Sequence, residues 1–297
     1  MVINFDLFLG STNTVNKITY TSSSVTNQPI IKLTDNVSSW NIGDTIVIGS
    51  TDFNQDHTEE FRLVNCTTCQ ANEVKLHRSP RYRHWGRIDT RTGVDQRAPV
   101  MLSSRNVKIE GEVGRNCLYA KTRESQEEDS LNYGRNFCKF FDGSGGQSTK
   151  PDSGDMHGGH VIITGGFDNV HITHVELKNM GQPQLARYPL HWHFCDDIGD
   201  TIYEDPSFFA HNSIHHGFNR FITIHGTENA RVYDNAGYLT RGHGYFIEDG
   251  WETGNEFDHN LGMVIHQGVT LPTDKGYSLC QDAREGFNGN LILYQAK

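Results

Sequence analysis

The chain has 297 residues, a formal net charge of −10, 30 glycines, and hydrophobic and charged contents of 35% and 21%. This mix favours a β-rich protein with many turns over a helical bundle, and the length allows a sizeable core. No apolar run approaches the roughly 18 residues that a membrane helix needs, and the overall acidity disfavours nucleic acid as a partner.

The N-terminal stretch MVINFDLFLGSTNTVNK lacks the basic and apolar regions of a signal peptide. The chain is therefore either intracellular or an internal piece of a longer secreted protein. The cysteines favour the second interpretation, because an even set suits disulfides in an oxidising compartment. Six cysteines are present, at positions 66, 69, 117, 138, 195 and 280.

We expect Cys66 to pair with Cys69 and Cys117 with Cys138, and we leave Cys195 and Cys280 unassigned. Structural zinc is the alternative at the first pair, but no second CxxC completes a four-thiolate site. Glycosylation sequons, which fit an extracellular glycoprotein, begin at asparagines 36 and 65.

The first hundred residues predict a domain of short strands, because β-branched and apolar runs alternate there with turn residues. The expected strands are residues 29–33, 44–49, 61–64 and 73–76, and a more regular region begins at 107–111. Residues 115–154 are mostly polar and contain two cysteines, so we expect an excursion tethered by a disulfide.

From residue 158 onward a degenerate repeat of apolar, polar, Asn and Gly positions recurs. The copies are residues 175–181, 232–238 and 257–263, with a looser copy at 213–218. Periods of roughly 20–25 residues with short strands indicate the stacked coils of a β-helix. Asparagine tolerates the left-handed backbone angles of tight corners, so we expect Asn179, Asn235 and Asn260 at equivalent corners.

A second family of strands is expected at residues 190–193, 222–225, 245–248 and 264–266. Strand side chains alternate between faces, so one set points inward and the other outward. The inward set is Leu190, Trp192, Ile222, Ile224, Tyr245 and Ile247. The outward rows are His191, Thr223 and Phe246, and His193, His225 and Glu248 with Asp249 beside them.

Neighbouring coils lie about 4.8 Å apart, which brings the members of a row within contact distance. Two imidazoles and a carboxylate at that spacing suit proton transfer or a divalent metal. The alternative is that outward histidines only hydrogen-bond along the row. Glycosidases need two carboxyls at a defined separation, which a sequence does not supply.

Residues 78–105 hold seven arginines against two aspartates, with Tyr82 and Trp85 among them. Arginine forks suit carboxylates and aromatic rings can stack on sugars, so this segment is a candidate for binding an acidic polysaccharide. The alternative is a solvated loop with scattered arginines.

Several stretches together resemble one known family. They include DNVSSWNIGDTIVIGSTDF, GVDQRAPVMLSSRNVKIEGEV, GGHVIITGGFDNVHITHVELKNMGQ, RYPLHWHFCDD, SIHHGFNRFITIHGT and GHGYFIEDG. The chain resembles the extracellular region of the cell-migration-inducing hyaluronan-binding protein and cell-surface transmembrane hyaluronidase family, from about residue 17 to 280. Fibrocystin-type proteins share a similar module. The Gln and Pro of GVDQRAP depart from the Met and Glu that relatives usually carry.

The resemblance implies an all-β chain that is a fragment of a longer protein. Residues 1–105 would be the C-terminal part of an eight-glycine-type β domain, and residues 106–297 a right-handed parallel β-helix. It also implies hyaluronan binding and endo-acting depolymerisation, with calcium dependence in the membrane member.

Our hypothesis is an extracellular glycoside hydrolase that binds and depolymerises hyaluronan or a related acidic glycosaminoglycan. Membrane attachment would come only through parts absent here. The rivals are a non-catalytic hyaluronan-binding or adhesion module, and a structural β-helix as in fibrocystin-like receptors.

The candidate residues fall into three groups. For catalysis they are His193, His225, Glu248, Asp249 and Asp95. For substrate binding they are Arg87, Arg91, Arg97, Arg187, Tyr82, Trp85 and Trp192. For calcium or another divalent metal they are His191, His193 and His225.

Overall fold

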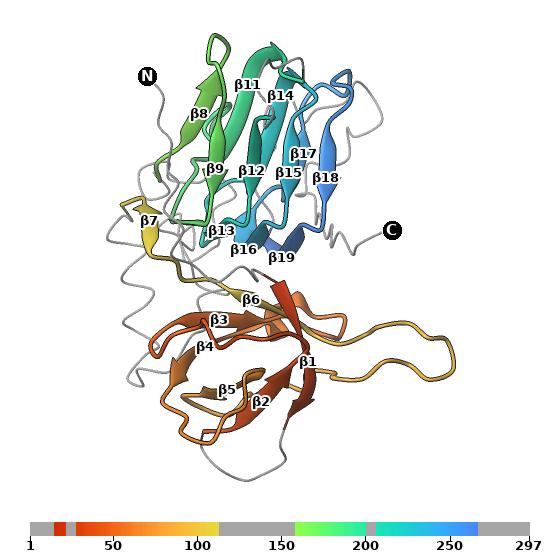
Figure 1. The fold of residues 1–297 in the computed structure, drawn as a ribbon. Helices are drawn as coiled ribbons and strands as arrows, with labels where there is room; N and C mark the ends of the chain where they lie inside the picture. Colours follow the sequence, from red (N-terminus) through yellow and green to blue (C-terminus); the bar gives the residue numbers. More distant parts are fainter. Residues whose placement is uncertain (1–14, 22–27, 113–157, 200–205, 267–297) are drawn as a thin grey trace, which may run out of the picture. The chain divides into compact units, whose positions relative to one another are not determined.

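A computed structural model describes residues 15–21, 28–112, 158–199 and 206–266. Within these ranges the chain is all-β apart from one 3-10 turn, Gln55–His57. It divides into two compact units, one ending at Asn106 and the other containing the strands from Val107 onward (Figure 1). No helix in the described ranges is long and apolar enough to cross a membrane.

The first unit is a closed antiparallel barrel with strand order β1-β2-β5-β4-β3-β6. Its core consists of alternate strand residues, among them Ile31, Ile46 and Phe61, each fully buried. The predicted strands are confirmed, and the assignment of this barrel to the eight-glycine type stays a prediction. The strands are β1 (Val15–Thr21), β2 (Ile30–Leu33), β3 (Thr45–Ile48), β4 (Glu59–Val64), β5 (Glu73–Leu76) and β6 (Pro99–Leu102).

The predicted Cys66–Cys69 disulfide is present in the turn between β4 and β5. Cys195 is a free, buried thiol whose Sγ donates to the Ile163 carbonyl at 3.3 Å. The other three cysteines and the expected excursion at 115–154 lie outside the described residues, so the Cys117–Cys138 pairing stays a prediction.

The second unit is a parallel β-helix, because successive strands enter three sheets in turn and every third strand pairs in parallel (Figure 1). The first sheet contains β7 (Val107–Glu110), β10 (Val175–Lys178), β13 (Ser213–His215), β16 (Ala236–Arg241) and β19 (Leu261–His266). The second contains β8 (Val161–Thr164), β11 (Leu190–Asp197), β14 (Ile222–Glu228) and β17 (Tyr245–Ile247). The third contains β9 (His171–Thr173), β12 (Phe208–Ala210), β15 (Arg231–Tyr233) and β18 (Glu256–Asp258).

The interior of the coils is filled largely by the residues expected there. Leu190, Ile222 and Ile224 are fully buried, and Tyr245 is nearly so. Ile247 departs from the expectation, because it is 38% exposed in β17, the last described strand of its sheet. Residues 264–266 were also placed in the wrong sheet, since β19 continues through them and pairs with β16.

Asparagines form a hydrogen-bonded row at one corner of successive coils. The Oδ1 of Asn235 accepts from the backbone and side-chain nitrogens of Asn212, and Oδ1 of Asn260 accepts in the same way from Asn235. The prediction was right for Asn235 and Asn260 but wrong for Asn179. Asn179 lies after β10 at a different corner, where its φ is +55° and its N–H donates to the His215 carbonyl.

We predict that Asn235→Ala lowers the free energy of unfolding by about 2–4 kcal/mol, because it leaves buried polar groups of two coils without their partner. Chemical denaturation followed by circular dichroism measures this. Glu256→Ala is the control in the same coils, since its ion pair with Arg231 is largely exposed and contributes about 0–1 kcal/mol. Equal losses in the two variants would contradict the structural role of the row.

Candidate functional site

The expected row of His193, His225 and Glu248 is confirmed on the outer face of the second sheet. His193 of β11 pairs in register with His225 of β14. Ile224 pairs with Ile247, and the next residue, Glu248, donates its N–H to the Ile224 carbonyl. The parallel register therefore places the three residues on neighbouring coils, as predicted.

His225 contacts His193, Glu248 and Asp249. Its Nδ1 lies 3.2 Å from Nδ1 of His193 and 3.8 Å from a carboxylate oxygen of Glu248. Its Nε2 lies 2.9 Å from a carboxylate oxygen of Asp249. A hydrogen bond between two Nδ1 atoms requires one to carry the proton and the other to accept it. The two rings therefore form a donor–acceptor pair beside two carboxylates.

His191 belongs to the same cluster, although it is fully buried rather than facing solvent as expected. Ala186 and Tyr188, from the segment before β11, cover its ring. Its Nδ1 donates to the Ala186 carbonyl at 3.1 Å. Its Nε2 is a buried acceptor with no hydrogen-bond partner within the described part of the chain. Thr223, next in that row, is buried as well.

The environment keeps two of the imidazoles neutral. Burial above all, and then the charges of His193, His225 and Arg220, lower the pKa of His191 to about 3. Burial and the neighbouring His225 also lower the pKa of His193 below its usual value of 6.5. A neutral imidazole has a lone pair for a metal or a proton.

One ring nitrogen from each of His191, His193 and His225 lies within 4.8 Å of the other two, and this triad could hold a metal ion. A metal-ligating histidine typically donates its other N–H to a carbonyl, as His191 does to Ala186. Three imidazoles suit zinc and similar transition metals. They do not suit calcium, which takes six to eight oxygen ligands.

Sequence reasoning missed two residues that hold the carboxylate end of the site. Arg220 is fully buried, and its Nη1 lies 3.3 Å from a Glu248 oxygen. Its guanidinium is sandwiched between the rings of Tyr188, at 4.1 Å, and Phe246, at 3.8 Å. The Tyr188 hydroxyl donates to the other Glu248 oxygen at 3.5 Å. A single arginine in an apolar run carries no sequence signal for this role.

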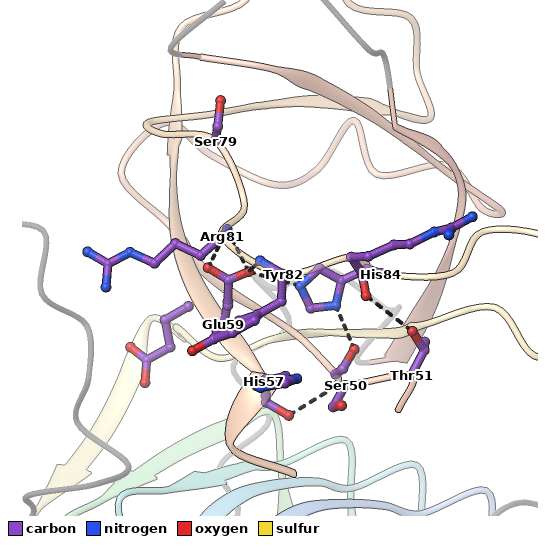
Figure 2. A network of polar contacts seen from close by, with 12 residues as sticks. Ser50, Thr51, His57, Glu59, Ser79, Arg81, Tyr82 and His84 are labelled. Atoms are coloured by element: carbon purple, nitrogen blue, oxygen red, sulfur yellow. Dashed lines mark hydrogen bonds and ion pairs between the residues drawn. The ribbon is translucent and has the colours of Figure 1, made fainter. Parts of the chain in front are cut away.

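In the barrel, the arginine-rich segment is organised by one buried carboxylate, Glu59 (Figure 2). It accepts from Arg78 Nη1 at 2.9 Å, from His84 Nε2 at 3.1 Å, and from the backbone N–H groups of Arg81 and Tyr82. Burial raises the pKa of Glu59, but these hydrogen bonds outweigh it and lower the pKa to about 2. Residues 78–84 are thus fastened to the barrel wall.

The candidate binding residues of the barrel differ in what they contact. Arg87 and Arg91 are exposed. Arg97 forms a bidentate ion pair with Asp95, in which both N–O distances are 2.8 Å. These two candidate residues therefore bind each other. The ring of Tyr82 stacks on His57 at 3.9 Å, and Trp85 lies under the Arg83 guanidinium at 4.9 Å.

On the β-helix, Arg187 donates to the Gln182 side chain at 2.8 Å. Trp192 is fully buried and stacks on Phe209 with ring centroids 4.3 Å apart. The alternation of side chains in β11 turns this ring into the core, as expected for the inward set, so it offers no exposed face to a sugar, and the part of Trp192 in substrate binding stays a prediction. The structure thus brings together His191, His193, His225, Glu248 and Asp249 on the β-helix, whereas Asp95 belongs to the barrel unit.

These features define a class of all-β protein in which a parallel β-helix carries a cluster of histidines and carboxylates on one outer sheet. Residues 156–296 match the family model described as CEMIP beta-helix. The β-helical part of this chain belongs to the CEMIP β-helix family.

Known relatives agree with this assignment. The cell surface hyaluronidase CEMIP2 of Homo sapiens is 40% identical over 263 residues, 88% of this chain and 17% of the relative. The cell migration-inducing and hyaluronan-binding protein of Homo sapiens is 38% identical over 267 residues, 89% of this chain and 18% of the relative. Fibrocystin-L of Mus musculus is 31% identical over 247 residues, 79% of this chain and 6% of the relative. The chain spans less than a fifth of the length of each of these three relatives.

We predict that acid destabilises the fold partly through His191. Its pKa is about 3 when folded and near 6.5 when unfolded, so between these values the unfolded chain binds a proton that the folded chain does not. Stability should therefore fall as the pH drops, by about 2 kcal/mol from pH 7 to pH 5 for this one group. Denaturation of wild type and His191→Gln at both pH values measures it. The variant should lose less stability than the wild type, and equal losses would contradict the assignment.

Proposed function

We propose that this chain binds hyaluronan, or a related acidic glycosaminoglycan, and contributes the proton-transferring groups of an endo-acting glycoside hydrolase. The observation that carries the proposal is the His193–His225 pair on the outer face of the second sheet, with two carboxylates that both contact His225. The names of two similar proteins, a hyaluronidase and a hyaluronan-binding protein, support the choice of substrate.

The geometry favours histidines over carboxyls as the groups that move protons. Hydrolysis of a glycosidic bond requires a proton for the leaving oxygen and an activated water. Glu248 is paired with Arg220, and Asp249 is paired with His225. In this proposal Asp249 orients His225. Nε2 of His193 gives its proton to the leaving oxygen while Nδ1 of His193 takes a proton from Nδ1 of His225, and the proton released by the attacking water returns to the pair.

The same imidazoles support a second arrangement, in which they hold a divalent metal of the zinc class, and not calcium, in place of the proton shared by His193 and His225. The support is the set of three imidazoles, the neutrality of two of them, and the buried Nε2 of His191. An ion of this class supplies an activated water at neutral pH and polarises a substrate oxygen.

The barrel would contribute charge for binding the polymer. Arg87 and Arg91 are exposed, and so are Arg81 and Arg83 beside them. An extracellular location fits the Cys66–Cys69 disulfide and the cell-surface name of a relative. The second candidate, a non-catalytic binding module, is favoured by the fact that Glu248, Asp249 and Asp95 each already have a basic partner.

We predict that the purified chain shortens hyaluronan and that His193→Ala and His225→Ala each abolish this while binding of long hyaluronan persists. The double variant should be no worse than either single one, because the two rings act as a unit. Gel electrophoresis of the polymer measures its size. His259→Ala, which changes a histidine elsewhere on the β-helix, is the control and should keep full activity.

A chelator arm of the same assay tests the metal. If the triad holds the ion, EDTA stops depolymerisation and Zn²⁺, but not Ca²⁺, restores it. If His193 and His225 relay protons without a metal, EDTA leaves the activity unchanged. Titration calorimetry should show Zn²⁺ binding to wild type and loss of that binding in His191→Gln. If the polymer is bound but never shortened with either ion, the chain is a binding module. Restoration by Ca²⁺ alone would contradict the imidazole site.

We predict that hyaluronan affinity falls as salt rises and that Arg87→Ala with Arg91→Ala weakens binding about three- to tenfold without lowering the melting temperature. Exposed arginine–carboxylate attraction is screened by salt and is modest at each contact. Surface plasmon resonance at 50 mM and 300 mM salt measures it. Arg231→Ala removes an exposed arginine of the β-helix and serves as the control. Unchanged affinity in the double variant would make these arginines part of a solvated loop.

A further inference from the structure

Phe194 is a large apolar side chain that the fold places at the surface immediately beside the histidine cluster. It is 53% exposed, although it lies in the middle of β11 between His193 and Cys195. Burial of such a ring would contribute about 1.5–3 kcal/mol of stability, so its exposure calls for a reason other than core packing.

The exposure has a local cause in the strand. His193 pairs with His225, but the next paired residues are Asp196 and Thr227, so β11 contains one more residue than β14 in this interval. An extra residue of this kind is a β-bulge, which redirects side chains and occurs often next to active sites. Phe194 has a φ of +50°, a left-handed conformation that costs a non-glycine residue of order 1–3 kcal/mol.

The ring is held in one orientation despite its exposure. It lies over Gly226, where a Cβ atom would come within 2.5 Å of Phe194 Cδ1, so a side chain at position 226 would displace it. Its centroid is 4.6 Å from that of His193 and 4.3 Å from that of His225. The Gly226 N–H is in turn fixed by a hydrogen bond to the Glu252 carboxylate at 3.1 Å.

From this geometry we infer that Phe194 is the stacking platform for one pyranose ring of the substrate, in the subsite next to His193. An exposed, oriented aromatic face beside proton-transferring groups suits the apolar C–H face of a sugar, and stacking would set the glycosidic oxygen against His193. The identity of the polymer as hyaluronan rests on the proposed function, whereas the stacking itself requires only a sugar ring.

The experiment compares four variants of the purified chain by titration calorimetry with hyaluronan oligosaccharides and by thermal melting. Phe194→Ala and Phe194→Leu should each raise Kd about fivefold to tenfold, because neither has an aromatic face. Phe194→Trp should keep the wild-type Kd and report binding by a change in fluorescence. Phe53→Ala removes a fully exposed phenylalanine of the barrel and should change nothing.

Leucine separates stacking from packing, since it keeps apolar bulk over Gly226. A weakened Phe194→Leu with an unchanged melting temperature supports the platform, and wild-type affinity in Phe194→Leu overturns it. If the wild type binds no hyaluronan, the proposed substrate fails, and the same variants are titrated with uncharged chitin and cellulose oligosaccharides. Binding of these that depends on an aromatic residue at 194 sustains the inference, and no binding by any of them overturns it.

Discussion

The candidate site depends on the parallel hydrogen-bonded register between β11, β14 and β17. That register pairs His193 with His225 and places Glu248 on the next coil. A shift of one residue would turn the histidines into the core and the apolar residues outward, because side chains alternate strictly along a strand. The fully buried Leu190, Trp192 and Ile222 oppose such a shift. The core that stabilises the coils therefore also aligns the chemistry on their outer face.

In each unit a buried ion pair fixes residues that the hydrogen bonds between strands leave unfixed. In the barrel, Glu59 fastens the arginine-rich segment through Arg78, His84 and two backbone N–H groups. In the β-helix, Arg220 and Tyr188 hold Glu248 beside His225. Burying a charge is costly unless it is paired and hydrogen-bonded, so each network specifies one arrangement strongly. Such networks give the site rigidity more than they give the fold net stability.

The site contains several features that lower the local stability of the fold. Neutral imidazoles, a buried His191 nitrogen without a hydrogen bond from the described residues, a strained Phe194 and a bulge all reduce stability locally. Structures tolerate such features where the surrounding packing over-determines them, and they concentrate at functional sites. Left-handed residues occur at many corners of this β-helix, but the register shift and the neutral imidazoles coincide at His193 and His225. This coincidence is the physical reason for assigning function to this sheet in preference to the asparagine row at the corner.

The sequence by itself determined the fold class, four of the six described barrel strands, the Cys66–Cys69 disulfide and the row of His193, His225 and Glu248, whereas β1 and β6 were not predicted. These depend on local alternation and on spacing, which a sequence records directly. It failed at Asn179 and at residues 264–266, because the corner that a residue occupies depends on how many residues each coil uses.

Only the tertiary structure decided the burial of His191, the partners of Glu248 and the exposure of Phe194. Arg220 is 28 residues from Glu248 in the chain, and Tyr188 is 60 residues from it. Such contacts arise from the stacking of coils, and a bulge that turns one ring outward leaves no pattern in the residues around it. The sequence therefore indicated part of the chemistry of the site. Its electrostatics and its aromatic face were set by packing between distant segments.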